Sequence, residues 1–261
     1  MMILILGGTE DGIIIGQALE TLGYSVRVSA KSQYGRSIIS KNGLTPCPTG
    51  LDISSGNMAE KLLSMGVGLV IDASHPFSTG VTKAAIEACR AVGIPIIRFE
   101  RPAGSIPDRD NIHRVDGFQD AASMTRRLIT SKRAFLAIGS KNLNWFTEQV
   151  DPAQLVVRVL PVASSLATCW ELGVSPKQIV AIQGPVSHSL NKALFENYEA
   201  SLLVTKESGE QGGLQNKLRA ALELNMEIIV INRPGSPDDS AVQTLSDMDA
   251  LIAVIRSGFY G

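Results

Sequence analysis

The stretch Met2-Ile-Leu-Ile-Leu-Gly-Gly-Thr-Glu-Asp-Gly12 decides the fold predicted for this chain. Five apolar residues before a glycine pair are typical of a buried parallel strand, and Ile13–Leu22 with Gly23 behind it is typical of the helix that follows. A strand, a tight glycine turn and a helix N-terminus make an anion site, because the helix directs free N–H groups at the ligand. The spacing G-G-T-x-x-G is a variant of the dinucleotide fingerprint. Taken alone, it fits an ordinary strand-to-helix turn equally well.

The composition indicates a well-buried α/β protein of two domains. The chain has 261 residues, of which 44% are hydrophobic and 19% charged. Its net charge is −1, with no large excess in either half, so we expect no nucleic-acid partner. Cys47, Cys89 and Cys169 form no C-x-x-C pair, which fits a reducing cytosol without disulfides or a metal site. We expect a cytoplasmic protein with no membrane or obligate protein partner, because no apolar run reaches about 18 residues and the N-terminus lacks a basic leader.

The first hundred residues alternate strands and helices. The expected strands after the first are Ser25–Ser29, Val67–Ala73 and Pro95–Arg98, and the expected helices are Asn57–Met65 and Pro76–Val92. Right-handed crossovers place the loops after these strands along one sheet edge, where doubly wound folds bind ligands. This pattern predicts a Rossmann-like dinucleotide-binding domain over residues 1–104.

The alternation resumes after a linker expected at Glu100–Asn111. The expected strands are Ala134–Ile138, Leu155–Leu160, Ile179–Ile182, Ser201–Thr205 and Glu227–Ile231, and the expected helices are Phe118–Ile129, Ser189–Tyr198, Leu214–Leu224 and Asp247–Ile255. We therefore predict a second α/β domain over residues 105–261 that binds the substrate. Ser246 is expected to cap the last helix, and Trp145, Phe146 and Trp170 are expected in the core.

The residues after the second expected strand favour NADPH over NADH. No acid occurs between Ser29 and Asp52, whereas Lys31 and Arg36 are available for a 2′-phosphate. The alternative interpretation is a solvated loop with two surface cations.

Polar residues follow other strands as well. Asp72-Ala-Ser74-His75-Pro76-Phe77 brings a carboxylate, a hydroxyl and an imidazole to the ligand-binding edge, although a single histidine is often only a structural hydrogen bonder. In the second half, Lys141, Arg158, Lys206 and Ser208 lie at or near strand ends. These residues could surround an anionic substrate, or they could be ordinary exposed loop residues. His113 and His188 are assigned no role.

Several motifs together resemble the precorrin-6A reductases, including the cobalt-precorrin-6A reductases, over nearly the whole chain. They are Gly7-Gly8-Thr9, Tyr34-Gly35-Arg36, Asp72–Phe77, Arg98-Phe-Glu-Arg-Pro102, Gly184-Pro185 and Thr205-Lys206-x-Ser208-Gly209. Glu207 and Glu210 depart from the family pattern, in which Asn and Gly are common at these positions.

The resemblance implies a cobalamin-pathway enzyme that reduces one ring double bond of a polycarboxylate tetrapyrrole with a reduced nicotinamide cofactor. It also implies two Rossmann-like doubly wound domains with a cleft between them and possibly a strand exchanged between domains. Such an enzyme must deliver a hydride from the cofactor and a proton from a side chain or water.

We combine the resemblance with the residue patterns in one hypothesis about the site. Gly7, Gly8, Thr9 and Gly12 are expected to hold the cofactor pyrophosphate, Ser29, Lys31 and Arg36 its adenosine end, and Ser74 and His75 the nicotinamide region. Lys141, Arg158, Lys206 and Ser208 are expected to face the substrate carboxylates. His75 and Lys206 are the candidate catalytic residues. NADPH is the expected cofactor, NADH remains possible, and no metal is expected. The alternatives are a redox-inactive NAD(P)-sensing module and a two-lobed small-ligand binder.

Overall fold

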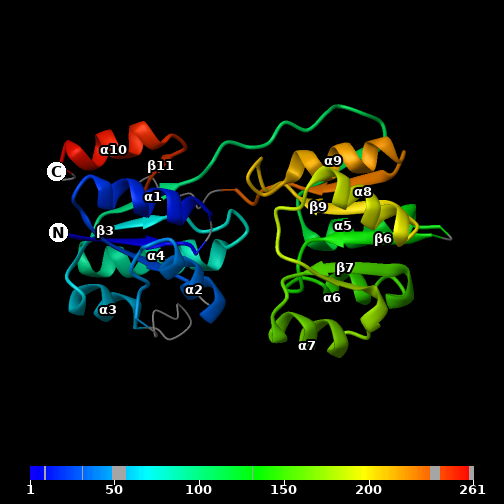
Figure 1. Ribbon diagram of the computed structural model, residues 1–261, viewed down its shortest axis with the longest axis horizontal. Coiled ribbons are helices and arrows are strands. Elements are labelled where there is room, and N and C mark those ends of the chain that lie inside the picture. The colour runs from blue at the N-terminus through cyan, green and yellow to red at the C-terminus, as the bar shows by residue number, and fades with distance from the viewer. Residues whose placement is uncertain (9, 31, 49–56, 131, 236–241, 259–261) are drawn as a thin grey trace. The chain divides into compact units, whose positions relative to one another are not determined.

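The computed structural model describes residues 1–258 except residues 9, 31, 49–56, 131 and 236–241. It divides into two compact units, one formed by Met1–Pro102 with Gly235–Gly261 and the other by Ala103–Pro234. The second unit thus ends at Pro234 and not at residue 261, because the C-terminal segment returns to the first unit. Each unit is built on one parallel sheet (Figure 1).

The first unit holds a five-stranded sheet in the order β11-β4-β3-β1-β2. Its strands are β1 (Met2–Leu6), β2 (Ser25–Ser29), β3 (Val67–Asp72), β4 (Ile96–Phe99) and β11 (Gln243–Leu245). Its helices are α1 (Glu10–Thr21), α2 (Gln33–Lys41), α3 (Met58–Ser64), α4 (Thr79–Val92) and α10 (Met248–Arg256). The late strand β11 pairs in parallel with β4, Leu245 opposite Phe99, which confirms the expected strand exchange.

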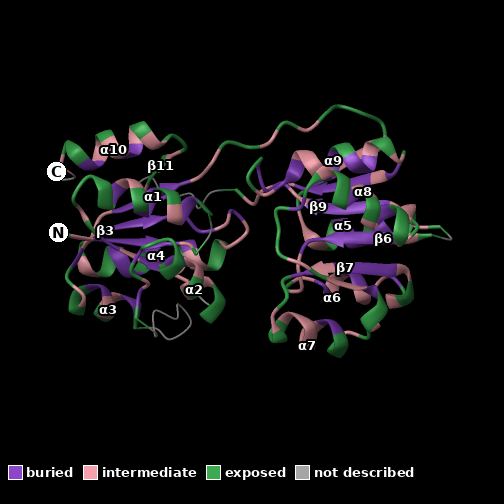
Figure 2. Cartoon of the chain, viewed as in Figure 1, coloured by how far each residue is buried: buried purple, intermediate pink, exposed green. Residues whose placement is uncertain are grey.

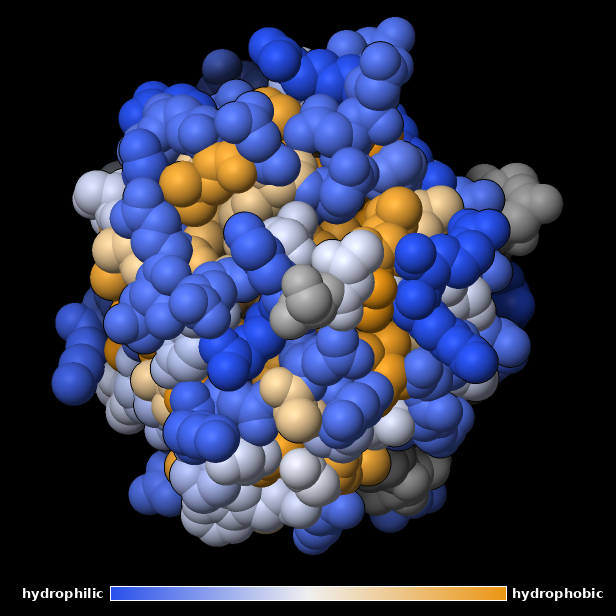
Figure 3. Space-filling model, turned by 90° about the vertical axis from the view of Figure 1, so that its right-hand side faces the viewer, coloured by the Kyte–Doolittle hydropathy of each residue, from blue (hydrophilic) through white to orange (hydrophobic). Residues whose placement is uncertain are grey.

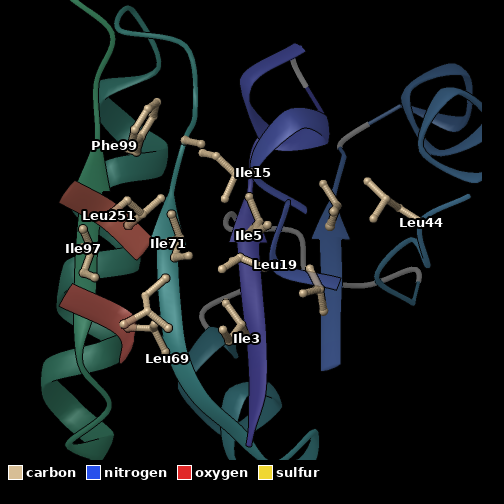
Figure 4. Packing of buried hydrophobic residues seen from close by; sticks show 14 of the residues in the cluster. Ile3, Ile5, Ile15, Leu19, Leu44, Leu69, Ile71, Ile97, Phe99 and Leu251 are labelled. Atoms are coloured by element: carbon tan, nitrogen blue, oxygen red, sulfur yellow. The ribbon is translucent and has the colours of Figure 1, made fainter. Parts of the chain in front are cut away.

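The two faces of this sheet bury separate apolar clusters. Ile3 and Ile5 of β1 pack with Ile15 of α1 and Leu251 of α10 (Figure 4). On the opposite face Leu4 packs in a cluster to which α3 and α4 contribute. Strand residues buried on both sides explain why β1 is a continuous apolar run rather than an alternating one.

The second unit holds a six-stranded sheet in the order β5-β10-β9-β6-β7-β8. Its strands are β5 (Ile112–Val115), β6 (Arg133–Ala137), β7 (Leu155–Val159), β8 (Ile179–Ala181), β9 (Ala200–Lys206) and β10 (Glu227–Ile231). Its helices are α5 (Phe118–Leu128), α6 (Asn144–Thr147), α7 (Ala163–Glu171), α8 (His188–Asn197) and α9 (Leu214–Glu223), with 3₁₀ turns at Pro152–Gln154 and Pro176–Gln178. Phe135 of β6 meets Phe195 of α8 edge to face, with ring centroids 4.9 Å apart, in the cluster that also buries one face of α9.

Burial is concentrated in the strands of both units, and the helices expose their outer faces (Figure 2). Trp170 contradicts the sequence prediction, because 56% of it is exposed on α7, whereas Phe146 is fully buried. The cap of α10 also differs: Asp247, not Ser246, accepts the Ala250 N–H at 2.8 Å. The surface shown in Figure 3 is mainly hydrophilic, with hydrophobic side chains in narrow strips.

Within the described residues, no helix has the length and apolar character needed to cross a bilayer. The same residues contain no group of three or more His, Cys, Asp and Glu side chains placed to hold a metal ion.

Candidate functional site

The three glycines in and after the turn that follows β1 have no room for side chains. Gly7 has φ +137°, and a Cβ there would lie 2.5 Å from the Ala73 carbonyl oxygen. A Cβ on Gly8 would lie 2.6 Å from the Ala30 Cβ, and one on Gly12 would overlap the Gly7 carbonyl oxygen. Because each position is closed to a Cβ, the backbone of this turn stays uncovered in front of α1, which is what a phosphate group needs.

Ala30 lies close to both the glycine turn and the start of α2. Ser32 caps α2 by accepting the Gly35 N–H at 2.9 Å, and a Cβ on Gly35 would come within 2.8 Å of the Ala30 Cβ. Gly8 and Gly35 therefore both approach Ala30 closely. Arg36 follows Gly35 in the first turn of α2 and is half-buried, and its role at the adenosine end stays a prediction.

Ser29 contributes to the glycine turn through its backbone. Its carbonyl accepts the Gly7 N–H at 3.2 Å, which joins the end of β2 to the turn. Thr9 and Lys31, predicted to bind the cofactor, lie outside the described residues.

A buried ion pair supports the loop after β3. Asp72 is fully buried, and its Oδ2 lies 3.0 Å from Nη1 of Arg98, which is 4% exposed. The same guanidinium donates to the Ser74 hydroxyl at 3.2 Å, and Asp72 Oδ1 accepts the Ser74 N–H at 3.0 Å. Asp72 and the Ser74 hydroxyl are thus both bound to Arg98, and the expected role of Ser74 in the nicotinamide region stays a prediction.

His75 lies half-buried on this loop. Its Nδ1 accepts the Phe77 N–H at 3.2 Å, and its ring lies 5.8 Å from the Phe77 ring between centroids. Because Nδ1 accepts this hydrogen bond, a neutral His75 ring carries its proton on Nε2. The loop thus presents an imidazole in a defined tautomer.

An acidic residue in the first turn of α1 is neutralised. Asp11 is 8% exposed and forms an ion pair and hydrogen bond with Arg101. An unpaired carboxylate here would repel a phosphate bound at the helix N-terminus. The pair with Arg101 removes that repulsion.

A pocket lined by residues that include Met1, Tyr24 and Gly68 lies at the opposite, amino edge of this sheet. None of the residues predicted to bind the cofactor lines this pocket.

Cations gather at the carboxyl edge of the second sheet. Arg158, one residue before the end of β7, donates to Asn191 Oδ1 of α8 at 3.0 Å. The Asn191 amide is oriented by its own donation to the carbonyls of Val186 and Ser187 at 3.0 and 2.9 Å. Because this partner is neutral, Arg158 keeps its full positive charge, and burial lowers the pKa of its guanidinium to about 10.

Lys206 ends β9, in the centre of the same edge. Burial, followed by the nearby charge of Lys141, lowers the pKa of the Lys206 ammonium to about 8. Lys141 follows β6 and is exposed. Lys141, in the loop after β6, is thus close enough to Lys206, at the end of the adjacent strand β9, for its charge to act there.

Lys217 is a further cation that the sequence analysis did not identify. It lies in the first half of α9 and is only 4% exposed. The charges of Arg158, Lys206 and Glu207 are close enough to act on its pKa. A signal was available in the sequence: Leu214, Lys217, Leu218 and Ala221 share the spacing of one apolar helix face, on which a lysine is unexpected.

The loop between β9 and α9 is organised by Glu207. This carboxylate is 2% exposed, accepts the N–H groups of Gly104 and Gly209 at 2.9 and 3.0 Å, and forms an ion pair with Arg233. Ser208 is buried and donates to the Gly212 carbonyl at 3.3 Å. The departure from Asn at residue 207 thus has a structural role, because the longer carboxylate side chain reaches across the loop.

Comparison with known proteins identifies the family. A family model described as Precorrin-6x reductase CbiJ/CobK matches residues 2–256. The chain belongs to the precorrin-6x reductase family. It is 34% identical to the cobalt-precorrin-6A reductase of Methanothermobacter thermautotrophicus, covering 98% of this chain and 85% of that protein. It is 33% identical to that of Priestia megaterium, covering 98% and 100%.

The fold of this precorrin-6x reductase family member is also that of a solved relative. A structure named CobK precorrin-6A reductase superposes with a TM-score of 0.75 over 99% of this chain and 97% of that chain, at 23% identity. The family and the α/β fold predicted from the motifs are therefore confirmed. The individual site residues stay predictions, which the geometry above places in two groups, one at the carboxyl edge of each sheet.

Proposed function

We propose that this protein reduces one ring double bond of precorrin-6A, or of its cobalt complex, with NADPH as the hydride donor. The observation that carries the proposal is the family match over residues 2–256. The names of the relatives specify the tetrapyrrole, and the cytoplasm is the expected compartment for such an enzyme.

The residues of the first unit fit a dinucleotide. Gly7, Gly8 and Gly12 leave the turn before α1 open to a pyrophosphate, and the Asp11–Arg101 pair removes the carboxylate charge next to it. Arg36 beside Ala30 supplies a cation for a 2′-phosphate, which favours NADPH over NADH. Ser29 and Lys31 are proposed at the same end and Thr9 at the pyrophosphate.

The second unit supplies positive charge for an acidic substrate. Lys141, Arg158 and Lys206 are proposed to bind carboxylates of the tetrapyrrole, with Ser208 holding the loop beside them. A charge-assisted hydrogen bond to a carboxylate contributes about 1.5–3 kcal/mol, so several such contacts are enough to select a polycarboxylate.

The reaction adds a hydride and a proton across a carbon–carbon double bond, and NADPH, when bound, supplies the hydride and leaves oxidised. The proton must come from a protein group or water. His75 and Lys206 are the proposed donors. Lys206 has a pKa of about 8, so it holds a proton near neutral pH that it can release, whereas His75 can donate only from its imidazolium form, in which both ring nitrogens carry a proton.

Anaerobic mixing of the protein with NADPH and precorrin-6A tests this proposal. The cofactor absorbance should fall in step with a shift of the pigment spectrum, one NADPH oxidised per pigment reduced. A protein that binds NADPH yet leaves both spectra unchanged would be a sensing module. A protein that binds pigment without consuming NADPH would be a ligand carrier.

A further inference from the structure

Lys217 is a buried lysine whose side-chain amine has no hydrogen-bond or ion-pair partner in the described part of the chain. It projects from the face of α9 that also carries Leu214, Leu218 and Ala221, all of them in the apolar cluster of the second unit. Burying an ammonium in such surroundings is costly unless a counter-ion compensates it.

The charged groups around Lys217 do not compensate it. Arg158 reaches this region from β7 and Lys206 from the end of β9, and both are cations. Glu207 is the only acid whose charge reaches it among the described residues, and that carboxylate already binds Arg233 and two backbone N–H groups. The remaining neighbour of Arg158, Asn191 of α8, is neutral. Among the described residues, the two cations that act on Lys217 thus outnumber the one acid that does.

A charged Lys217 in this cluster would oppose folding, because like charges repel strongly where water is excluded. Replacing a buried charge by an apolar side chain of similar size is often neutral or stabilising. A lysine at this position is thus explained by a ligand that brings the missing negative charge.

We propose that Lys217 is a further anion ligand of this site, that it joins Arg158 and Lys206 in binding one carboxylate of the substrate, and that it takes up a proton as that carboxylate binds. The proposal rests on the proposed function, since it names which group of the tetrapyrrole enters the second unit.

The protonation of the free protein supports the proton uptake. Burial first, then the charges of Arg158 and Lys206, lower the pKa of the Lys217 amine well below its ordinary value, although Glu207 acts in the opposite direction. A carboxylate bound against the amine restores the charged form. Lys206, with a pKa of about 8, is only about one-tenth deprotonated at pH 7 and takes up little.

Calorimetric titration with precorrin-6A, without cofactor and at pH 7, measures this proton in buffers that differ in ionisation enthalpy. Wild type should take up protons as the ligand binds, and Lys217→Met should take up close to none, with affinity about 10- to 100-fold lower. The matched control is Lys177→Met, which removes an exposed lysine of the same unit and should behave as wild type. Lys217→Gln, which keeps a polar side chain without the charge, should repeat the Met result.

Thermal unfolding without ligand gives an independent measurement. Lys217→Met should unfold at a higher temperature than wild type, because wild type must remove the proton of Lys217 and bury a polar amine in order to fold, whereas Lys177→Met should leave the temperature unchanged. If both Lys217 variants bind with wild-type affinity and proton uptake, and unfold at a lower temperature, Lys217 is structural and the inference fails. If wild type itself neither binds nor reduces precorrin-6A, the proposed function fails instead.

Discussion

Asp72 and Arg98 face each other in register at the carboxyl ends of β3 and β4, with the guanidinium 3.0 Å from the carboxylate. Both side chains are almost fully buried, and through Ser74 they fix the loop that carries His75. The pair lies beneath the proposed nicotinamide region, and it therefore links the stability of the sheet to the geometry of the site.

Breaking this pair should cost stability. Arg98→Met leaves the Asp72 carboxylate buried without its counter-ion, so we expect a loss of about 3–5 kcal/mol in the free energy of unfolding, measured by urea denaturation. The double variant Asp72→Asn with Arg98→Met should lose less than the sum of the two single variants, because no uncompensated charge remains. Strict additivity would show that the two side chains do not act as a unit.

Arg36 should distinguish the two nicotinamide cofactors. Arg36→Ala should raise the Michaelis constant for NADPH about 10- to 100-fold and leave that for NADH nearly unchanged, because only NADPH has the 2′-phosphate. Lys41→Ala, which removes an exposed cation from the same helix α2, is the matched control and should change neither constant. Equal losses for both cofactors in the Arg36 variant would remove this residue from the phosphate site.

His75 should affect turnover more than cofactor binding. His75→Ala is expected to lower kcat about 100-fold or more, the loss typical of a general acid–base residue, with NADPH affinity largely retained. The control is His113→Ala, because His113 lies on β5 of the other unit, binds Glu227 of β10 and has no proposed catalytic role. Normal turnover of the His75 variant together with a lower unfolding temperature would make this histidine a structural hydrogen bonder.

The predictions made from sequence succeeded where burial alone determines an element. β10 was predicted with its observed bounds, and β1 follows from five apolar residues before Gly7, because a strand buried on both faces must be apolar throughout. β11 was missed, since its three half-buried or exposed residues, Gln243–Leu245, pair with β4 only through the tertiary fold. α2 was missed because its polar sequence after Ser32 is typical of a loop.

The candidate site was predictable in part for the same reason. Residues at strand ends, such as His75 and Lys206, could be predicted, since parallel strands deliver their carboxyl ends to one edge. The partners that orient them were not: Asn191 reaches Arg158 from a helix 33 residues further along the chain. Lys217 was missed because it occupies a position on the apolar face of α9, where the spacing predicts core residues and not ligands.

Lys206 should make substrate binding depend on pH. Its ammonium has a pKa of about 8, so it is charged below pH 8 and neutral above it, and its attraction for a carboxylate is lost as the pH rises through that value. We expect Lys206→Ala to weaken tetrapyrrole binding about 10- to 100-fold at pH 7, with NADPH binding intact, as measured by separate titrations of pigment absorbance and cofactor fluorescence.

Lys206→Arg is the sharper variant, because a guanidinium stays charged throughout this range. It should retain binding at pH 7 and hold it at pH 9, where the wild-type affinity falls. Tetrapyrrole affinity that is unchanged in Lys206→Ala, or a wild-type affinity that is flat from pH 7 to 9, would contradict a role for Lys206 in binding the substrate carboxylates. The exposed Lys141 and the buried Arg158 would then have to hold them without it.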